Sequence, residues 1–225
     1  MQDVLEPALA VIAGVPVGVT AAGRTDRGVH ARAQVVHFDT SVARPESAWV
    51  RGVNALLPDS VAVLWSKPMP DDFHARYSAV SRTYRYRLLN RPVRPALEAA
   101  YAGWFHRPLD LPSMRAAAAL LVGEHDFSAF RSSECQARTP VRTLHALEVQ
   151  GGGERIDFLL RANAFLHHMV RNIVGSLVYV GKGKHPPEWL REVLQSRERA
   201  NAAPTFGPQG LYLEKVEYDA RWALP

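Results

Sequence analysis

The spacing of apolar residues in the first third of the chain predicts the order helix, strand, strand, helix, strand. Apolar positions at helical spacing run from Val4 to Ile12, and Gly14 ends that helix. The following strand, strand, helix and strand are expected at residues 15–19, 34–40, 49–57 and 61–65.

The remaining two thirds repeat this order with a strand added at the front. Side chains alternate along residues 83–89, with tyrosines and a leucine on one face and arginines on the other. Three glycines at residues 151–153 predict a β-hairpin. The elements expected here are a strand at 83–89, a helix at 113–122, strands at 143–150 and 155–162, helices at 165–180 and from 187, and a strand at 211–218.

This order predicts an α+β fold of two ferredoxin-like (β-α-β-β-α-β) halves with antiparallel sheets, the first half lacking its opening strand. The prolines and polar residues of 66–82 mark the boundary. We therefore expect an N-terminal half at residues 1–72 and a C-terminal half at 73–225. A basic cleft between two such sheets is a common place for a site.

Composition narrows the class of protein. The 225 residues are 47% hydrophobic and 22% charged, and no apolar run reaches transmembrane length, so we expect a globular, cytoplasmic protein. The single cysteine, Cys135, excludes an internal disulfide and a multi-cysteine zinc site. A net charge of +5 favours a polyanionic partner.

The stretch AAGRTDRGVHARAQVVHF, residues 21–38, places one carboxylate, Asp26, between Arg24 and Arg27 in a glycine-flanked loop. An aspartate in a loop is most often a turn-capping residue. Cations on both sides instead favour a carboxylate that stays ionised as a nucleophile or ion-pair partner. Arg27 has an alternative role, facing outward as a phosphate contact.

The stretch NAFLHHMVRNIVG, residues 163–175, inserts polar residues into an apolar helix, with His168 and Arg171 along one face. Such a face is ordinarily solvated, but here we expect Arg171 to be half-buried and to require an anionic partner. His167 and His168 are adjacent and should point in different directions on a helix. Because the chain also has no HExxH motif or cysteine cluster, we expect no metal site.

Two further stretches have both a structural and an RNA-binding interpretation. The tyrosines of residues 83–89 are most often the buried face of a strand, but aromatic residues beside arginines also stack on unpaired bases. The basic stretch RSSECQARTPVR, from Arg131 to Arg142, is either solvated surface or a loop that contacts phosphate.

Together these stretches resemble the TruA-type tRNA pseudouridine synthase family. The matching segments follow the family order over about residues 1–218: AGRTDRGVHA, QVVHFDT, DDFHARYSA, SRTYRYR, GEHDFSAFR, VRT, NAFLHHMVRNIVG and GLYL. The segments AGRTDRGVHA and NAFLHHMVRNIVG are highly specific in combination.

The resemblance implies isomerisation of uridine to pseudouridine in the anticodon stem-loop of tRNA, at positions 38, 39 and 40, by a homodimer that needs no metal or organic cofactor. By this resemblance Asp26 is the catalytic aspartate, Arg171 pairs with it, and Tyr84 contacts the target base. Arg24 holds the flipped nucleotide, and His168 and Arg142 are further substrate contacts. Attack by Asp26 on the base and action at the sugar both remain open.

Two departures from the family pattern stand out. Many members have alanine in place of Arg27, and members begin with a strand and an aromatic loop before the first helix. We therefore expect that Met1 is a misread valine codon and that the chain extends upstream. Two rival functions are a non-catalytic RNA-binding module, which would be expected to lose Asp26 or Arg171, and a hydrolase, which would need partner acids that the sequence lacks.

Overall fold

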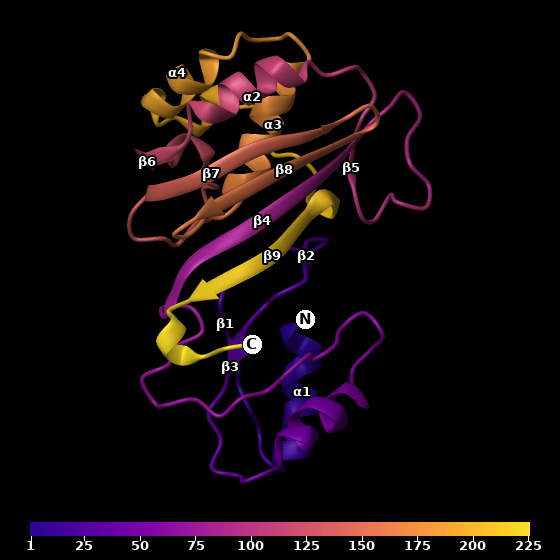
Figure 1. The fold of residues 1–225 in the computed structure, drawn as a ribbon, viewed down its shortest axis with the longest axis vertical. Helices are drawn as coiled ribbons and strands as arrows, with labels where there is room; N and C mark the ends of the chain where they lie inside the picture. The colour runs from indigo at the N-terminus through magenta and orange to yellow at the C-terminus, as the bar shows by residue number, and fades with distance from the viewer. The chain divides into compact units, whose positions relative to one another are not determined.

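The computed structural model describes residues 1–225, and they form two compact units (Figure 1). Unit 1 comprises Met1–Arg24, Gln34–Val80 and Glu217–Pro225, and unit 2 comprises Thr25–Ala33 and Ser81–Val216. The loop that carries Asp26 therefore belongs to unit 2, although unit 1 segments flank it in the sequence. None of the helices has the length and apolar character needed to cross a membrane.

Unit 2 is built on a seven-stranded sheet in the order β2-β9-β4-β8-β7-β6, with β5 paired to β4. The strands are β2 (His30–Ala31), β4 (Ala79–Asn90), β5 (Gly103–Phe105), β6 (Gly123–Asp126), β7 (Val141–Gly152), β8 (Arg155–Ala162) and β9 (Leu211–Tyr218). The pairs β4–β8, β8–β7 and β7–β6 are antiparallel, whereas β2–β9 and β4–β5 are parallel. The mixed α+β class is confirmed.

Strand β4 illustrates why this sequence forms the sheet. The buried side chains Tyr84, Tyr86 and Leu88 alternate with the partly exposed Arg85 and Arg87, as a period of two requires. The predicted hairpin between β7 and β8 is also present.

Three helices pack on this sheet: α2 (Leu111–Ala119), α3 (Met169–Gly181) and α4 (Trp189–Ser196). Their apolar faces join the buried side chains of β4, β7 and β8 in one core. Gly175 lets α3 approach a loop closely, because a Cβ there would lie 2.3 Å from the Pro204 oxygen. The predicted start of α3 near Phe165 is wrong, since His168 has a φ of 63° and the helix begins after it.

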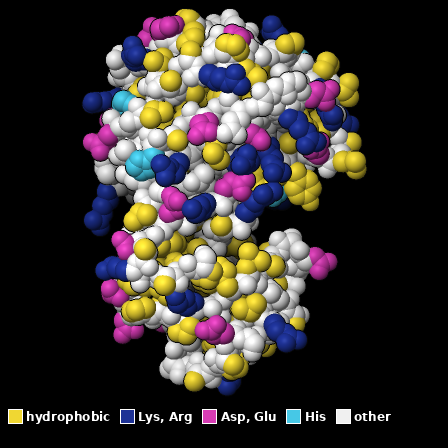
Figure 2. Space-filling model, viewed as in Figure 1, with side chains coloured by type: hydrophobic (Ala, Val, Ile, Leu, Met, Phe, Trp, Pro, Cys, Tyr) yellow, Lys and Arg dark blue, Asp and Glu magenta, His cyan; other side chains and the backbone are white.

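Unit 1 is smaller and contains α1 (Gln2–Ala13), β1 (Thr20–Ala21), β3 (Val36–His37) and a π-helical turn, η1 (Ala48–Gly52). β1 and β3 form an antiparallel pair. Its core gathers Leu5 and Leu9 of α1 with Trp49 and Val53. Other apolar side chains of unit 1, including the 67% exposed Val11, lie on the surface, and Figure 2 shows hydrophobic side chains gathered there.

Two strands predicted in the first third are wrong. Residues 15–19 form no strand, and Pro16 among them has no N–H to give to a neighbouring strand. Residues 61–65 are also irregular, because the side chain of Asn54 donates to the Val63 oxygen at 2.8 Å and accepts from the Val63 N–H at 2.7 Å. The short strands β2, β5 and β6 were not predicted, as each has only two to four residues.

Candidate active site

A tight turn presents Asp26. The Val29 N–H donates to the Asp26 carbonyl at 3.0 Å, and Gly28 has a φ of 82°. Glycine is favoured at the third position of such a turn because a side chain there is strained. The loop is anchored directly afterwards, where His30 and Ala31 of β2 pair with β9.

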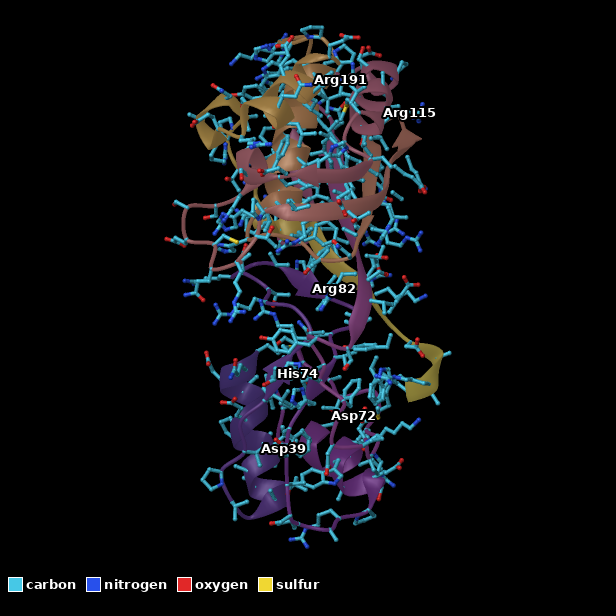
Figure 3. All side chains as sticks on the ribbon, turned by 90° about the vertical axis from the view of Figure 1, so that its left-hand side faces the viewer. Asp39, Asp72, His74, Arg82, Arg115 and Arg191 are labelled. Atoms are coloured by element: carbon cyan, nitrogen blue, oxygen red, sulfur yellow. The ribbon has the colours of Figure 1, made fainter.

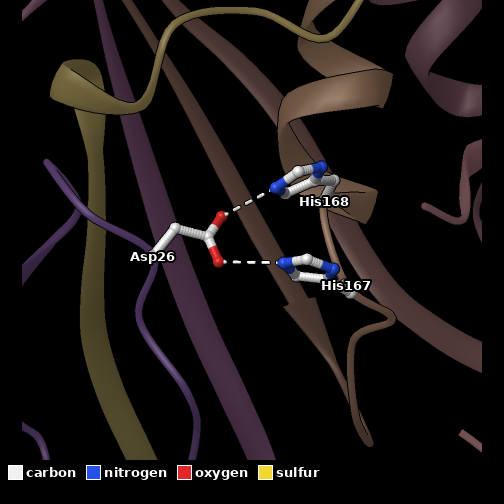
Figure 4. A group of neighbouring side chains, drawn as sticks. All are labelled: Asp26, His167 and His168. Atoms are coloured by element: carbon white, nitrogen blue, oxygen red, sulfur yellow. Dashed lines mark hydrogen bonds and ion pairs between the residues drawn. The ribbon is translucent and has the colours of Figure 1, made fainter. Parts of the chain in front are cut away.

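Three side chains from one short segment surround the Asp26 carboxylate, and Figure 4 shows the two histidines among them. His167 Nε2 lies 3.0 Å from Oδ1, His168 Nε2 lies 3.2 Å from Oδ2, and Arg171 Nη1 lies 3.0 Å from Oδ2. The Asp26 side chain is 25% exposed and that of Arg171 only 13%. Both carboxylate oxygens therefore have partners, and one oxygen contacts a permanent cation.

The two histidines reach the same carboxylate because they precede α3 instead of lying on it. His168 is left-handed, and the imidazole centroids of His167 and His168 are 4.0 Å apart. The prediction that these rings point in different directions is wrong, since it assumed a helix from Phe165. His167 is the residue that sequence reasoning missed, although its place beside His168 in the FLHHMVRN segment was the available signal.

Backbone contacts fix the histidine segment and Arg171. The His167 carbonyl accepts from the Ser132 N–H at 3.0 Å, and the His167 N–H donates to Cys135 Sγ at 3.4 Å. Arg171 Nε donates to the Phe206 carbonyl at 2.9 Å. The guanidinium is therefore oriented from two directions, which favours a fixed geometry over a flexible surface ion pair.

Electrostatics divide the roles of these partners. Burial lowers the pKa of His168, as do the nearby charges of His167 and Arg171, and the opposing effect of Asp26 is smaller. His168 is therefore neutral at neutral pH, and its Nε2 lies 3.2 Å from Asp26 Oδ2. Arg171 supplies a permanent positive charge beside the carboxylate, with Nη1 3.0 Å from Oδ2.

The same residues have the chemistry of a metal site. One ligand atom each from Asp26, His167 and His168 lies within 4.8 Å of the others, and imidazole with carboxylate suits several divalent transition metals. A metal ion here would compete with Arg171, which already contacts Asp26 Oδ2. The arrangement is better suited to holding an anionic carboxylate than to ligating a second cation.

Tyr84 is a buried neighbour of this site. Its ring meets Phe165 edge to face at a centroid distance of 5.0 Å. Burial raises the pKa of Tyr84 to about 12, with the Asp26 charge adding to the rise and Arg82 opposing it. The phenol therefore stays protonated throughout the neutral range.

The remaining predicted cations have other positions. Arg24 is exposed and forms no hydrogen bond or ion pair, and Arg27 is likewise exposed, so neither contributes a direct partner of the kind that Arg171 provides. Arg142 donates through Nη1 to the carbonyls of Thr139 and Val141, and burial lowers its pKa. Arg131 is committed to the carbonyls of its own loop.

The fold and site thus define an α+β protein whose candidate nucleophile is a loop aspartate held by an arginine and two histidines. The chain belongs to the tRNA pseudouridine synthase family, whose model matches residues 1–78 and 117–219. This membership makes it an enzyme of the isomerase class.

Several curated relatives support the assignment. A tRNA pseudouridine synthase A of Burkholderia thailandensis is 59% identical over 225 residues, which cover the whole of this chain and 83% of that protein. The proteins of the same name from Nitrosomonas europaea and Nitrosomonas eutropha are each 58% identical over the whole chain, covering 83% and 81% of their lengths.

Proposed function

We propose that this enzyme converts uridine to pseudouridine in the anticodon stem-loop of tRNA, at positions 38, 39 and 40, with Asp26 as nucleophile. The observation that carries the proposal is the 3.0 Å contact between Arg171 Nη1 and Asp26 Oδ2, in a site that leaves Asp26 partly accessible. An anionic, oriented carboxylate is what covalent catalysis at a nucleoside requires.

The reaction breaks the bond between N1 of uracil and C1′ of the ribose. Uracil rotates, C5 bonds to C1′, the C5 proton leaves, and N1 gains a proton. Substrate and product are isomers, so the overall reaction consumes no co-reactant. Asp26 adds either to the base or to the sugar, and it is released as the C5–C1′ bond forms or afterwards.

The proposed roles of the other residues are those that the family resemblance implies. The target uridine must leave the base stack, at a cost of a few kcal/mol that stacking and phosphate contacts offset. Tyr84 contacts the flipped base, and its hydroxyl is suited to relaying the C5 proton. Arg24, which is exposed and has no partner in the chain, holds the flipped nucleotide, and His168 and Arg142 are further substrate contacts.

Three broader features belong to the same proposal. The order β9-β4-β8-β7 and the element order of unit 2 support a ferredoxin-like half, which we place at residues 73–225, with residues 1–72 as the other half. We also propose a homodimer, and a cytoplasmic enzyme, since its substrate is tRNA.

The test is to incubate the protein with unmodified tRNA and to map pseudouridine by carbodiimide-dependent stops of reverse transcription. Wild type should give stops at positions 38, 39 and 40. Asp26→Asn should reduce them by at least about a thousandfold while leaving tRNA affinity within about twofold, because the amide is isosteric but not nucleophilic. Residual turnover above about a hundredth of wild type would move the nucleophile to another residue.

A further inference from the structure

A pocket of unit 2 shares His168 with the Asp26 site. It has a volume of about 610 Å³, and the residues that define its chemistry are Ser128, Ser132, Ser133, His168, Arg197 and Arg199. We propose that this pocket binds a backbone phosphate of the RNA, from the target nucleotide or its immediate neighbour. The inference rests on the proposed function, because it assigns a subsite to the same RNA substrate.

The chemistry of the pocket fits a phosphate. Hydroxyl and guanidinium groups line it, and no carboxylate does. Arginine, serine and threonine side chains together with backbone N–H groups are the usual phosphate contacts in protein–nucleic acid complexes. The pocket is therefore suited to an anion.

Not every arginine around the pocket is available. Arg131 Nη2 donates to the carbonyls of Cys135 and Ala137, which fixes the serine-bearing loop. Arg199 Nη2 donates to Asn172 Oδ1 and Thr205 Oγ1, both at 3.1 Å. These two guanidinium groups form the wall of the pocket and help to hold its shape.

Arg197 is the exposed arginine of the pocket, and it is held by one ion pair. Its side chain is 70% exposed, and its one ion pair is a contact of 3.4 Å between Nε and Asp126 Oδ2. It follows α4 directly and has a left-handed backbone, with a φ of 57°. A phosphate in the pocket gives this guanidinium a charge-assisted hydrogen bond that the long contact with Asp126 does not provide.

The position of His168 determines which phosphate is bound. Its imidazole lines the pocket, and its Nε2 lies 3.2 Å from Asp26 Oδ2. Only one side chain therefore separates a phosphate in the pocket from the proposed nucleophile. This places the bound phosphate next to the reacting nucleotide.

The first experiment measures binding of an anticodon stem-loop RNA in the Asp26→Asn background, where turnover should be at least about a thousandfold slower. Arg197→Gln should weaken binding about five- to thirtyfold and reduce the log–log salt slope by about one, because one phosphate contact is lost. The matched control is Arg191→Gln, which removes the same charge from an exposed position of α4 (Figure 3) and should change affinity by less than twofold. Equal effects of the two substitutions would overturn the inference.

The second experiment replaces single phosphates of the RNA with neutral methylphosphonates. At one position flanking the target uridine, the difference between Arg197 and Arg197→Gln should disappear. A penalty that persists at every flanking position would show that the pocket does not bind a phosphate there. Pseudouridine mapping with the wild-type enzyme is run in parallel, so loss of this subsite and failure of the proposed function give different results.

Discussion

The Arg171–Asp26 ion pair predicts a measurable coupling between two residues that are 145 positions apart in the sequence. Arg171→Met removes the guanidinium and leaves a carboxylate that is only 25% exposed without its permanent counter-ion. Asp26→Asn removes the negative charge and leaves the Arg171 guanidinium without its carboxylate partner. In the double variant no uncompensated charge remains, so it should be less destabilised than the two single losses added together.

The magnitude follows from the geometry. Two unit charges about 4 Å apart attract by about 4 kcal/mol at an effective dielectric constant of about 20. Water reaches part of Asp26 and screens the pair, which lowers this value. Fully exposed ion pairs, which contribute less than about 1 kcal/mol, set the lower end of the range. We therefore expect a coupling free energy of about 2 kcal/mol.

The assay is urea unfolding of the wild type, both single variants and the double variant, followed by circular dichroism at one pH and salt concentration. The control cycle uses Arg91 and Glu154, a 3.4 Å pair whose side chains are 31% and 65% exposed. That cycle should give a coupling below about 0.5 kcal/mol. Additivity within about 0.3 kcal/mol for Arg171 and Asp26 would refute the reasoning, because independent sites behave in that way.

Three further predictions test the surroundings of Asp26. Tyr84→Phe keeps the ring, so tRNA affinity should stay within twofold, while turnover should fall at least about tenfold because the hydroxyl is lost. Turnover equal to that of wild type would mean that Tyr84 only stacks on the base. Because the pKa of His168 is lowered in the folded state, stability should fall as pH drops through about 6.5, where the unfolded chain binds the proton first. His168→Gln should reduce that fall in urea midpoints between pH 7 and 5, and an unchanged slope would contradict this. Gly28→Ala should destabilise the fold by about 1 kcal/mol and lower turnover, because Gly28 has a φ of 82°. The control Gly18→Ala should have little effect, since there is open space around Gly18. Equal melting temperatures of the two variants would contradict the prediction.

The long strands β4, β7 and β8 of unit 2 could be predicted from sequence because each has one buried face. Strands β8 and β9 have the predicted bounds, 155–162 and 211–218. The alternation of apolar and polar side chains is a local pattern, and it is present wherever one face of a strand packs on a core. In unit 1 the same signal failed at residues 61–65, because Asn54 occupies the backbone groups of Val63. Hydrophobic periodicity cannot predict a hydrogen bond of this kind between a side chain and the backbone.

The site was only partly predictable. Asp26 and Arg171 were chosen because a loop carboxylate beside cations and an arginine in an apolar helix both need partners. The sequence neighbours Arg24 and Arg27 were expected to act on Asp26, whereas its partners in the structure are His167, His168 and Arg171, of which the family resemblance implied only Arg171. These partners follow from tertiary packing, which no local pattern encodes.

The backbone at His168 explains how one short segment can serve both oxygens of Asp26. On a continuous helix, adjacent side chains point about 100° apart, so His167 and His168 would not reach the same carboxylate. A left-handed residue before Met169 breaks that constraint and brings the two imidazoles to 4.0 Å. Left-handed backbone at a non-glycine residue costs of order 1–2 kcal/mol, and such conformations cluster at functional sites. Three side chains from residues 167–171 then surround the carboxylate, while the start of α3 places Arg171 on the oxygen that His168 also contacts. The left-handed backbone at His168 is therefore part of what places both imidazoles and Arg171 around the Asp26 carboxylate.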